Sequence, residues 1–437
     1  MNVTRTPNIR QILKTGAILF FLSTSLSPSY SYAQRRQEIM EEKDVPPYTL
    51  PDPLVFNTGN PVKSKKQWKK RREEILTMAK REMYGQSPEK PKGLHFKVFD
   101  EDPNALGGIA TRKQITISLS EKPDAPKFDL LIYYPNKIKG PAPVFLGLNF
   151  EGNHAINTDP GIRLSKTWVW AGAKGAKDSK PTEASRGATA SRWHIERLLD
   201  RGYAVATVFA NEIALDKKGP LNTGVLAAYP ELQDRGDNFS TIGAWAWGLS
   251  RAMDYLETDP KANKKQVMVF GFSRMGKASL WAGAQDQRFA VTISNESGGG
   301  GAALSKRIFG EDVARLTNGN PHWFATNFKK YNQNEEALPF DQHMIVSLIA
   351  PRAVYIASAE QDKGADPYGE FLTAQAADPV YRFLGVKGFP ATHYPALHEP
   401  ILGGHIAYHV RAGNHDVTDY DWDQYMNFAD RYFKQKP

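Results

Sequence analysis

A serine on a predicted tight turn is the residue best placed for covalent chemistry. Residues 266–277 read QVMVFGFSRMGK, so Ser273 lies between an apolar run and a helical pattern. A strand followed at once by a helix would expose the serine hydroxyl at the carboxyl end of a sheet. Backbone N–H groups at the start of that helix could bind an oxyanion. The segment predicts a nucleophile; the alternative is a serine that only caps the helix.

Two cations, Arg274 and Lys277, follow the serine within one helical turn. Positive charge at a helix N-terminus opposes the helix dipole, so helix stability does not favour this placement. We interpret Arg274 as a group that holds a developing oxyanion and Lys277 as a donor to substrate oxygens. The alternative is a pair of exposed cations neutralised by nearby carboxylates.

A general base and an acid are needed beside such a serine, and in α/β-hydrolases they follow it in the order acid, then histidine. Among five late histidines, His415 lies just past an apolar run at 406–411, and we predict it as the base. Taken by itself, a histidine at this place is more often a surface loop residue than a base. Two acids follow predicted strands, Glu296 and Asp362. Either could orient the imidazole, and the residues alone leave both open.

Strands alternate with helices from about residue 191 onward, which favours a mostly parallel sheet with helices on both faces. With the serine turn, this predicts an α/β-hydrolase fold, a three-layer αβα sandwich. The predicted strands are 94–98, 114–119, 128–134, 143–150, 203–209, 266–271, 290–294, 353–358 and 406–411. The predicted helices are 68–84, 191–201, 241–256, 274–285, 369–383 and 420–433.

One catalytic domain is expected over residues 34–437, because no second hydrophobic core with its own linker is visible. Residues 34–90 would form an N-terminal arm that starts irregular and proline-rich and ends in a helix. Residues 153–190 are rich in Gly, Ala, Ser and Lys and contain Trp168 and Trp170. A loop of this length is usually functional or mobile, so we interpret it as an insertion beside a pocket.

The first 33 residues have the pattern of a signal peptide: a basic start, an apolar run of about a dozen residues and a Ser-Tyr-Ala end. We expect cleavage after Ala33, with an uncleaved anchor as the alternative. The run is shorter than the ~20 residues that span a bilayer, and no later run approaches that length. The sequence therefore predicts an exported protein, periplasmic or secreted, without a membrane segment in its mature form.

The composition and charge of the chain exclude several kinds of site. The chain of 437 residues has a formal charge of +9 and no cysteine, which excludes disulfides and thiolate metal sites. Three of the positive charges fall in the leader, and the densest basic run, at 63–72, is followed by Glu73 and Glu74. We interpret that run as a solvated helix face rather than a nucleic-acid site.

With these residues identified, the sequence resembles the glucuronoyl esterases, a family of carbohydrate esterases, from about residue 146 to 433. Residues 271–277, GFSRMGK, are similar to the family signature G-x-S-R-x-G-K, which places the second glycine one residue later than the common G-x-S-x-G elbow. Further stretches that resemble the family are 148–152 (LNFEG), 244–248 (AWAWG), 295–298 (NESG), 321–324 (PHWF) and His415 with Asp421-Trp422.

The resemblance implies roles for these residues. Ser273 would be the nucleophile, His415 the base and Glu296 the acid, with Asp362 matching a second acid position among bacterial members. Arg274 would stabilise the oxyanion and Lys277 would bond sugar hydroxyls. Glu311, His322 and Trp323 would line the sugar pocket. The chain departs from many members at Gly364, where they carry a sugar-stacking tryptophan, so stacking would fall to Trp168 or Trp170 or be weaker.

The predicted function is hydrolysis of glucuronic or 4-O-methylglucuronic acid esters, such as links between xylan and lignin, by an acyl-enzyme on Ser273. The mechanism needs no metal or cofactor. We expect a monomer whose partner is glucuronoxylan or a small uronic-acid ester. One alternative is an acetyl-xylan or other carbohydrate acyl esterase, and another is a non-catalytic carbohydrate-binding protein on a hydrolase scaffold.

Overall fold

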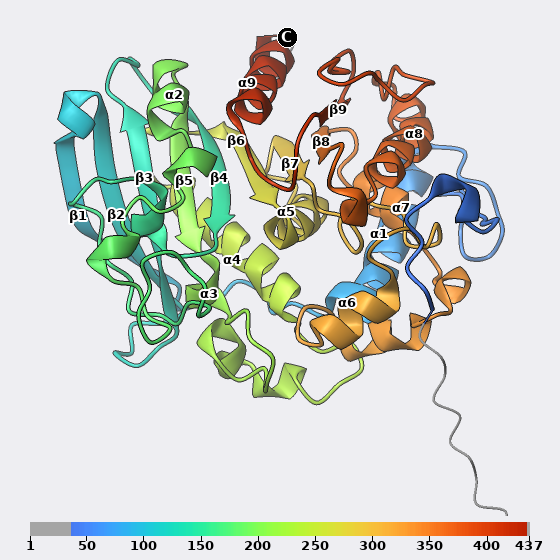
Figure 1. Ribbon diagram of the computed structural model, residues 1–437, viewed down its shortest axis with the longest axis horizontal. Helices are drawn as coiled ribbons and strands as arrows, with labels where there is room; N and C mark the ends of the chain where they lie inside the picture. The colour runs from blue at the N-terminus through green and yellow to red at the C-terminus, as the bar shows by residue number, and fades with distance from the viewer. Residues whose placement is uncertain (1–35, 435–437) are drawn as a thin grey trace, which may run out of the picture. The chain divides into compact units, whose positions relative to one another are not determined.

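The computed structural model describes residues 36–434, and residues 38–437 group into one compact unit. The predicted leader lies outside the described residues. Within them, one sheet of nine strands runs in the order β1-β2-β3-β5-β4-β6-β7-β8-β9 (Figure 1). The strands are β1 His95–Ala105, β2 Ala110–Ser118, β3 Lys127–Pro135, β4 Ala142–Asn149, β5 Ala204–Phe209, β6 Ala262–Phe272, β7 Val291–Asn295, β8 Ala353–Ala359 and β9 Ile406–Arg411.

The sheet has an antiparallel end and a parallel body. β1, β2, β3 and β5 pair antiparallel, whereas β5, β4, β6, β7, β8 and β9 pair parallel. The parallel strands are almost wholly buried and rich in Val, Ile and Ala, as expected for strands covered on both faces. This confirms the predicted mostly parallel sheet.

Helices cover both faces of the parallel body. The α-helices in the described residues are α1 Lys65–Ala79, α2 Ile195–Asp200, α3 Ala210–Ile213, α4 Thr241–Leu256, α5 Arg274–Gln285, α6 Val313–Gly319, α7 Gln342–Ser347, α8 Pro367–Phe383 and α9 Asp419–Lys434. Alternate residues of β6 point to opposite cores: Val267 and Val269 join the side of α1, α4, α5, α7 and α8, and Met268 and Phe270 join the side of α2 and α9. The three-layer αβα sandwich of the α/β-hydrolase fold is therefore confirmed.

Most predicted elements agree with the structure within a few residues, but β1 runs seven residues past its predicted end at 98, and three short helices were not predicted. The sequence reading did not predict α3, α6 or α7, which have four to seven residues each. The helix predicted over 191–201 begins only at Ile195, after a 3-10 turn at Ala190–Arg192. Elements this short have too few residues for a periodic pattern to stand out.

The two irregular segments have few regular elements. Residues 36–62 hold one 3-10 turn, at Glu42–Asp44, and the predicted insertion at 153–190 holds only 3-10 turns and loops. None of the helices described is long and apolar enough to cross a bilayer.

Candidate active site

The turn around Ser273 has the strained geometry of a nucleophile elbow. Ser273 joins β6 to α5 with φ 57° and ψ −132°, a conformation that costs a non-glycine residue on the order of 1–3 kcal/mol. Its side chain makes no capping hydrogen bond to α5. The alternative of a simple helix cap is therefore wrong, and the strain points to a functional serine.

Two glycines allow the chain to turn this tightly. A Cβ atom at Gly271 would lie 2.0 Å from the carbonyl oxygen of Met275, and one at Gly276 would lie 2.9 Å from the Cβ of Ser297. The first contact is inside the elbow, and the second is with the loop after β7. The later position of the second glycine thus reflects close packing between the helix and that loop.

His415 lies beside the elbow and contacts both candidate acids. Its ring packs 4.5 Å, centroid to centroid, from Phe272, the residue before the nucleophile. Its Nδ1 is 2.6 Å from Oδ2 of Asp362 and 3.2 Å from Oε2 of Glu296. Because both carboxylates contact Nδ1, Nε2 is left to exchange a proton with the serine. The structure thus brings His415 together with both predicted acids, next to the residue that precedes Ser273.

The two carboxylates dominate the electrostatics of the imidazole. Burial lowers the pKa of His415, but the hydrogen bonds and charges of Asp362 and Glu296 outweigh burial and raise this pKa to about 9. Burial raises the pKa of Glu296 to about 7, against the opposing effects of His415 and Arg411. Since His415 is 41% exposed, it can still reach a substrate bound at the surface.

The two acids differ in what else they bind. Glu296 is fully buried and receives Arg411 Nη2 at 2.5 Å and the backbone N–H of Asp416 at 3.1 Å. Arg411 also donates to Asp421 at 2.9 Å. Glu296 is thus fixed inside a buried ion network, whereas the side-chain hydrogen bond of Asp362 is to His415. The shorter contact and the simpler surroundings favour Asp362 as the acid that orients the base.

Asp216, which sequence reasoning missed, organises one wall of the site. Its carboxylate forms an ion pair with Arg274 and accepts hydrogen bonds from His322 Nε2 at 2.9 Å and Trp323 Nε1 at 2.7 Å. The guanidinium of Arg274 also lies 4.5 Å from the ring of Phe150. Burial alone would raise the pKa of Asp216, but His322 and Arg274 hold it below its usual range. Arg274, His322 and Trp323 therefore belong to one cluster.

Lys277 is buried and its three donors are already engaged. Its ammonium donates to the carbonyls of Ser297 and Gly299 at 2.7 and 2.6 Å and to Glu311 Oε2 at 3.0 Å. An ammonium has three protons, so Lys277 would have to release a partner to bond a sugar hydroxyl. That Lys277 donates to substrate oxygens stays a prediction, and it requires such a release. Glu311, whose side chain is 42% exposed, faces solvent beside it.

Glu370 of α8 was also missed by sequence reasoning, and it joins the loops after β7 and β8. Its Oε1 accepts the backbone N–H groups of Ser297 and Gly298, both at 3.0 Å, and its Oε2 accepts the hydroxyl of Ser358 at 2.6 Å. Burial raises its pKa to about 8 despite these donors. The carboxyl ties the residue after Glu296 to the end of the strand that precedes Asp362.

Comparison with known proteins agrees with this geometry. Residues 172–385 match the family model described as glucuronyl esterase, fungi. A carbohydrate esterase from an unknown prokaryotic organism is 50% identical over 95% of this chain and 97% of its own length. The chain belongs to the glucuronoyl esterase family.

Solved structures of bacterial esterases superpose on this family member over nearly all of their length. A promiscuous esterase of carbohydrate esterase family 15, from a marine bacterial metagenome, is 50% identical with a TM-score of 0.86, covering 91% of this chain and 100% of that one. The glucuronoyl esterase from Solibacter usitatus is 47% identical with a TM-score of 0.84, covering 90% and 100%. This chain is accordingly an esterase with the α/β-hydrolase fold.

The two tryptophans of the 153–190 segment differ in their exposure to solvent. Trp170 is 50% exposed and interacts with Glu151, which follows β4, whereas Trp168 is half-buried under Lys217. A Cβ atom at Gly364 would meet nothing within 4 Å. The position where many members carry tryptophan is therefore open, and Trp170 is the more accessible of the two predicted substitutes.

The catalytic histidine and its two carboxylates are also the one group in the described chain whose ligand atoms could hold a metal ion. Those of Glu296, Asp362 and His415 lie within 4.8 Å of one another. In this esterase the hydrogen bonds at His415 Nδ1 explain their convergence.

Neither Asp216 nor Glu370 belongs to a sequence motif with a recognisable spacing, so only their positions in the fold reveal them.

Proposed function

We propose that this esterase hydrolyses alkyl and aryl-alkyl esters of glucuronic and 4-O-methylglucuronic acid, in nature those between xylan side chains and lignin alcohols. The observation that carries the proposal is the strained Ser273 beside a histidine held by two carboxylates, in a member of this family. An exported enzyme would meet such a polymer, and the leader-like first 33 residues support export.

The reaction begins at the ester carbonyl of the uronic acid. Ser273 Oγ attacks the carbonyl carbon while His415 Nε2 takes the hydroxyl proton. The resulting oxyanion is held by the backbone N–H of Arg274, the residue after the nucleophile, and by the charge of its guanidinium. His415 then gives the proton to the departing alcohol, and the acyl group remains on the serine.

Water completes the cycle. His415 takes a proton from a water molecule, which attacks the acyl carbon, and gives that proton to Ser273 Oγ as the second tetrahedral intermediate collapses to free uronic acid. Asp362 and Glu296 keep Nδ1 protonated and stabilise the imidazolium that forms in each half-reaction. The alcohol has left before the water attacks, so the identity of the alcohol affects only the rate of acylation.

The test is an ester panel on the wild type and Ser273→Ala. We expect the wild type to release alcohol from methyl and benzyl glucuronate, and Ser273→Ala to lose at least ~10³-fold in kcat because the acyl-enzyme cannot form. Unchanged folding, checked by circular dichroism, is the control. Retained activity in Ser273→Ala would refute the mechanism, and failure of a serine-reactive phosphonate to label the wild type would favour a non-catalytic protein.

A second candidate is a broader carbohydrate acyl esterase. The open space at Gly364 favours it, since a site without a stacking ring there would select less strongly for the uronic acid. A promiscuous relative at 50% identity is compatible with this reading. A kcat/KM for acetyl-xylan equal to or above that for benzyl glucuronate would support the broader function.

A further inference from the structure

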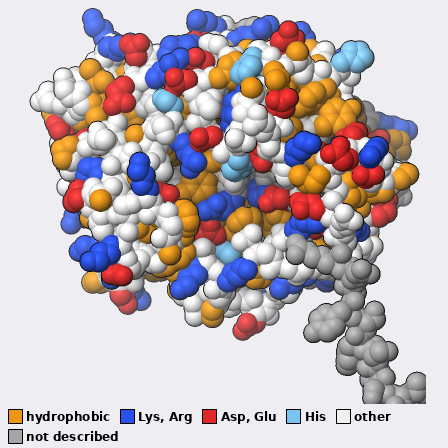
Figure 2. Space-filling model, viewed as in Figure 1, with side chains coloured by type: hydrophobic (Ala, Val, Ile, Leu, Met, Phe, Trp, Pro, Cys, Tyr) orange, Lys and Arg blue, Asp and Glu red, His pale blue; other side chains and the backbone are white. Residues whose placement is uncertain are grey.

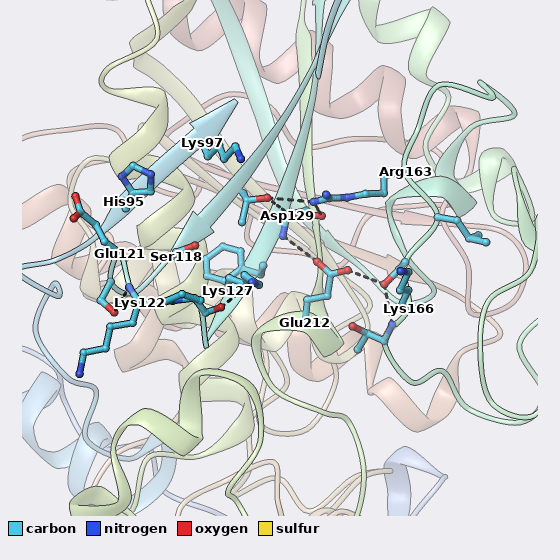
Figure 3. Close-up of a pocket in the computed structure, with 17 residues that line it drawn as sticks. His95, Lys97, Ser118, Glu121, Lys122, Lys127, Asp129, Arg163, Lys166 and Glu212 are labelled. Atoms are coloured by element: carbon cyan, nitrogen blue, oxygen red, sulfur yellow. Dashed lines mark hydrogen bonds and ion pairs between the residues drawn. The ribbon is translucent and has the colours of Figure 1, made fainter. Parts of the chain in front are cut away.

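A second hollow lies at the antiparallel end of the sheet, apart from the catalytic residues. It has a volume of about 710 Å³ and is lined by the start of β1, the end of β2 with the turn into β3 and the first residues of β3, residues 163–167, and Glu212 of α3 (Figure 3). No triad residue and no member of the Asp216 cluster lines it. We call it the lysine groove.

Four lysines, Lys97, Lys122, Lys127 and Lys166, surround the lysine groove, and all four are exposed. Within the described part of the chain, none of them has a carboxylate within ion-pair distance. The groove's arginine, Arg163, is by contrast paired with Asp129. The lining also holds three acids, Glu121, Asp129 and Glu212, so its five cations outnumber its carboxyl groups and leave a net positive charge, which attracts anions.

The floor of the lysine groove is polar and internally ordered. Asp129 Oδ1 accepts the hydroxyl of Thr116 at 2.7 Å, and Glu212 accepts the backbone N–H of Asp129 at 2.9 Å and the hydroxyl of Ser165 at 2.7 Å. Figure 3 shows Asp129 and Glu212 between the surrounding cations. Carboxyl oxygens with lone pairs to spare are acceptors for sugar hydroxyls.

The lysines at the rim and the hydrogen-bond acceptors on the floor together indicate which class of polymer the groove could bind. Nucleic acid is disfavoured because carboxyl groups on the floor would lie close to its phosphates. A neutral glycan usually stacks on an open aromatic ring, but Phe128 in this groove is only 1% exposed. A polymer with both hydroxyls and carboxylates fits both features.

We propose that the lysine groove is a binding site for an acidic polysaccharide, with uronate carboxylates on its lysines and sugar hydroxyls on its floor. This goes beyond the proposed ester hydrolysis, because the groove would hold polymer without cleaving it.

The position of the groove suits an extended polymer. β3 starts where β5 ends, so the groove opens at the same carboxyl edge of the sheet as Ser273. Four strand steps, β2-β3-β5-β4-β6, separate the two sites, or roughly 19 Å at about 4.8 Å per step. The segment that supplies Arg163 to Thr167 continues to Trp170 beside Glu151, after β4. One chain of several sugars could contact both.

The experiment uses the whole enzyme with two matched charge variants. The groove variant replaces Lys97, Lys122, Lys127 and Lys166 by alanine. The control variant replaces four exposed lysines of the basic run, Lys63, Lys65, Lys66 and Lys70, by alanine and loses the same charge. Binding is measured by affinity electrophoresis with glucuronoxylan, with the same xylan after carboxyl reduction, and with duplex DNA.

We expect the groove variant to bind glucuronoxylan about tenfold more weakly and the control variant to bind it within about twofold of the wild type. Carboxyl-reduced xylan should bind weakly to all three proteins, and methyl glucuronate hydrolysis should be equal in all three. Equal weakening in both variants, or tight binding of the reduced xylan, would overturn the proposal. Tighter binding of DNA than of glucuronoxylan would overturn it too. Because small-ester activity is measured separately, failure here does not touch the proposed function.

Discussion

One nitrogen of His415 receives two carboxylates, and this doubling is the most unusual feature among the catalytic residues. Asp362 makes the shorter contact, at 2.6 Å, and Glu296, at 3.2 Å, is shared with Arg411. Two anions at one imidazole stabilise its protonated form more than one would. The free enzyme should therefore hold His415 protonated to unusually high pH, as its raised pKa of about 9 indicates.

This electrostatic arrangement predicts a pH effect of single substitutions. The base must be deprotonated to attack, so kcat/KM falls as pH drops below the pKa of His415. Asp362→Asn removes one anion and lowers that pKa, so the acidic limb should move to lower pH by about one unit. The maximal rate should fall as well. The measurement is kcat/KM for methyl glucuronate from pH 5 to 10.

The variant Glu296→Gln distinguishes the role of Glu296 from that of Asp362. Removing the Glu296 carboxylate takes one ion-pair partner from the buried Arg411. We therefore expect a lower Tm together with any change in the pH profile. Asp362→Asn should leave Tm nearly unchanged because Asp362 is only partly buried. A profile that stays in place in Asp362→Asn and moves in Glu296→Gln would assign the acid to Glu296 instead.

At the scale of elements, the loops after β7 and β8 must be held in register for both acids to reach one ring. Glu370 of α8 performs this task by bonding two backbone N–H groups after Glu296 and the hydroxyl of Ser358 at the end of β8. Glu296 itself has φ 46°, a conformation that needs support from its surroundings. Glu370 is thus a positioning residue for the catalytic pair.

Replacing Glu370 tests that role. Glu370→Ala should lower kcat about 10- to 100-fold with little change in KM, because the loops lose their common anchor while the sugar pocket stays. Glu370→Gln should keep most of the activity, since its amide oxygen can still accept both N–H groups. The comparison is steady-state kinetics on benzyl glucuronate, with Tm as the folding control. Equal activity of Glu370→Ala and wild type would contradict a positioning role.

The same elements show what the sequence could and could not predict. Ser273, His415 and both acids were accessible because each follows an apolar run that is itself a strand, and strand ends of a parallel sheet converge. Asp216 and Glu370 were not, because their roles depend on contacts with residues 12 to 107 positions away in the chain. Lys277 was found as a site residue, but its enclosure by the Ser297 and Gly299 carbonyls depends on the path of a glycine-rich loop.

At the scale of the whole molecule, charged side chains gather with a histidine in a hollow on one face, shown in Figure 2. The N-terminal arm is tied to the catalytic domain by an ion network in which Arg307 and Asp366 are buried and Glu42 is exposed. Arg307, 2% exposed, pairs with Glu42 of the arm and with Asp366, which caps α8. His343 of α7 contacts the carbonyl of Pro51, and Gly310 donates to the carbonyl of Ile39. The arm therefore supports the helix that carries Glu370 and the loop that carries Asp362.

Removing the cation from this network should destabilise the fold in a pH-dependent way. Arg307→Met leaves buried Asp366 without its partner, which costs about 3 kcal/mol when the carboxylate is charged. Burial already raises the pKa of Asp366 to about 6 against the opposing effect of Arg307, so the variant should raise it further. Because a carboxyl whose pKa is raised by folding binds its proton more tightly in the folded state, stability falls as pH rises through that pKa. The loss in the free energy of unfolding should thus be larger at pH 8 than at pH 5, as measured by urea denaturation.

The double variant Arg307→Met, Asp366→Asn is the control, and it should recover much of the stability at pH 8. If Arg307→Met lost equal stability at both pH values, the loss would come from packing rather than from charge.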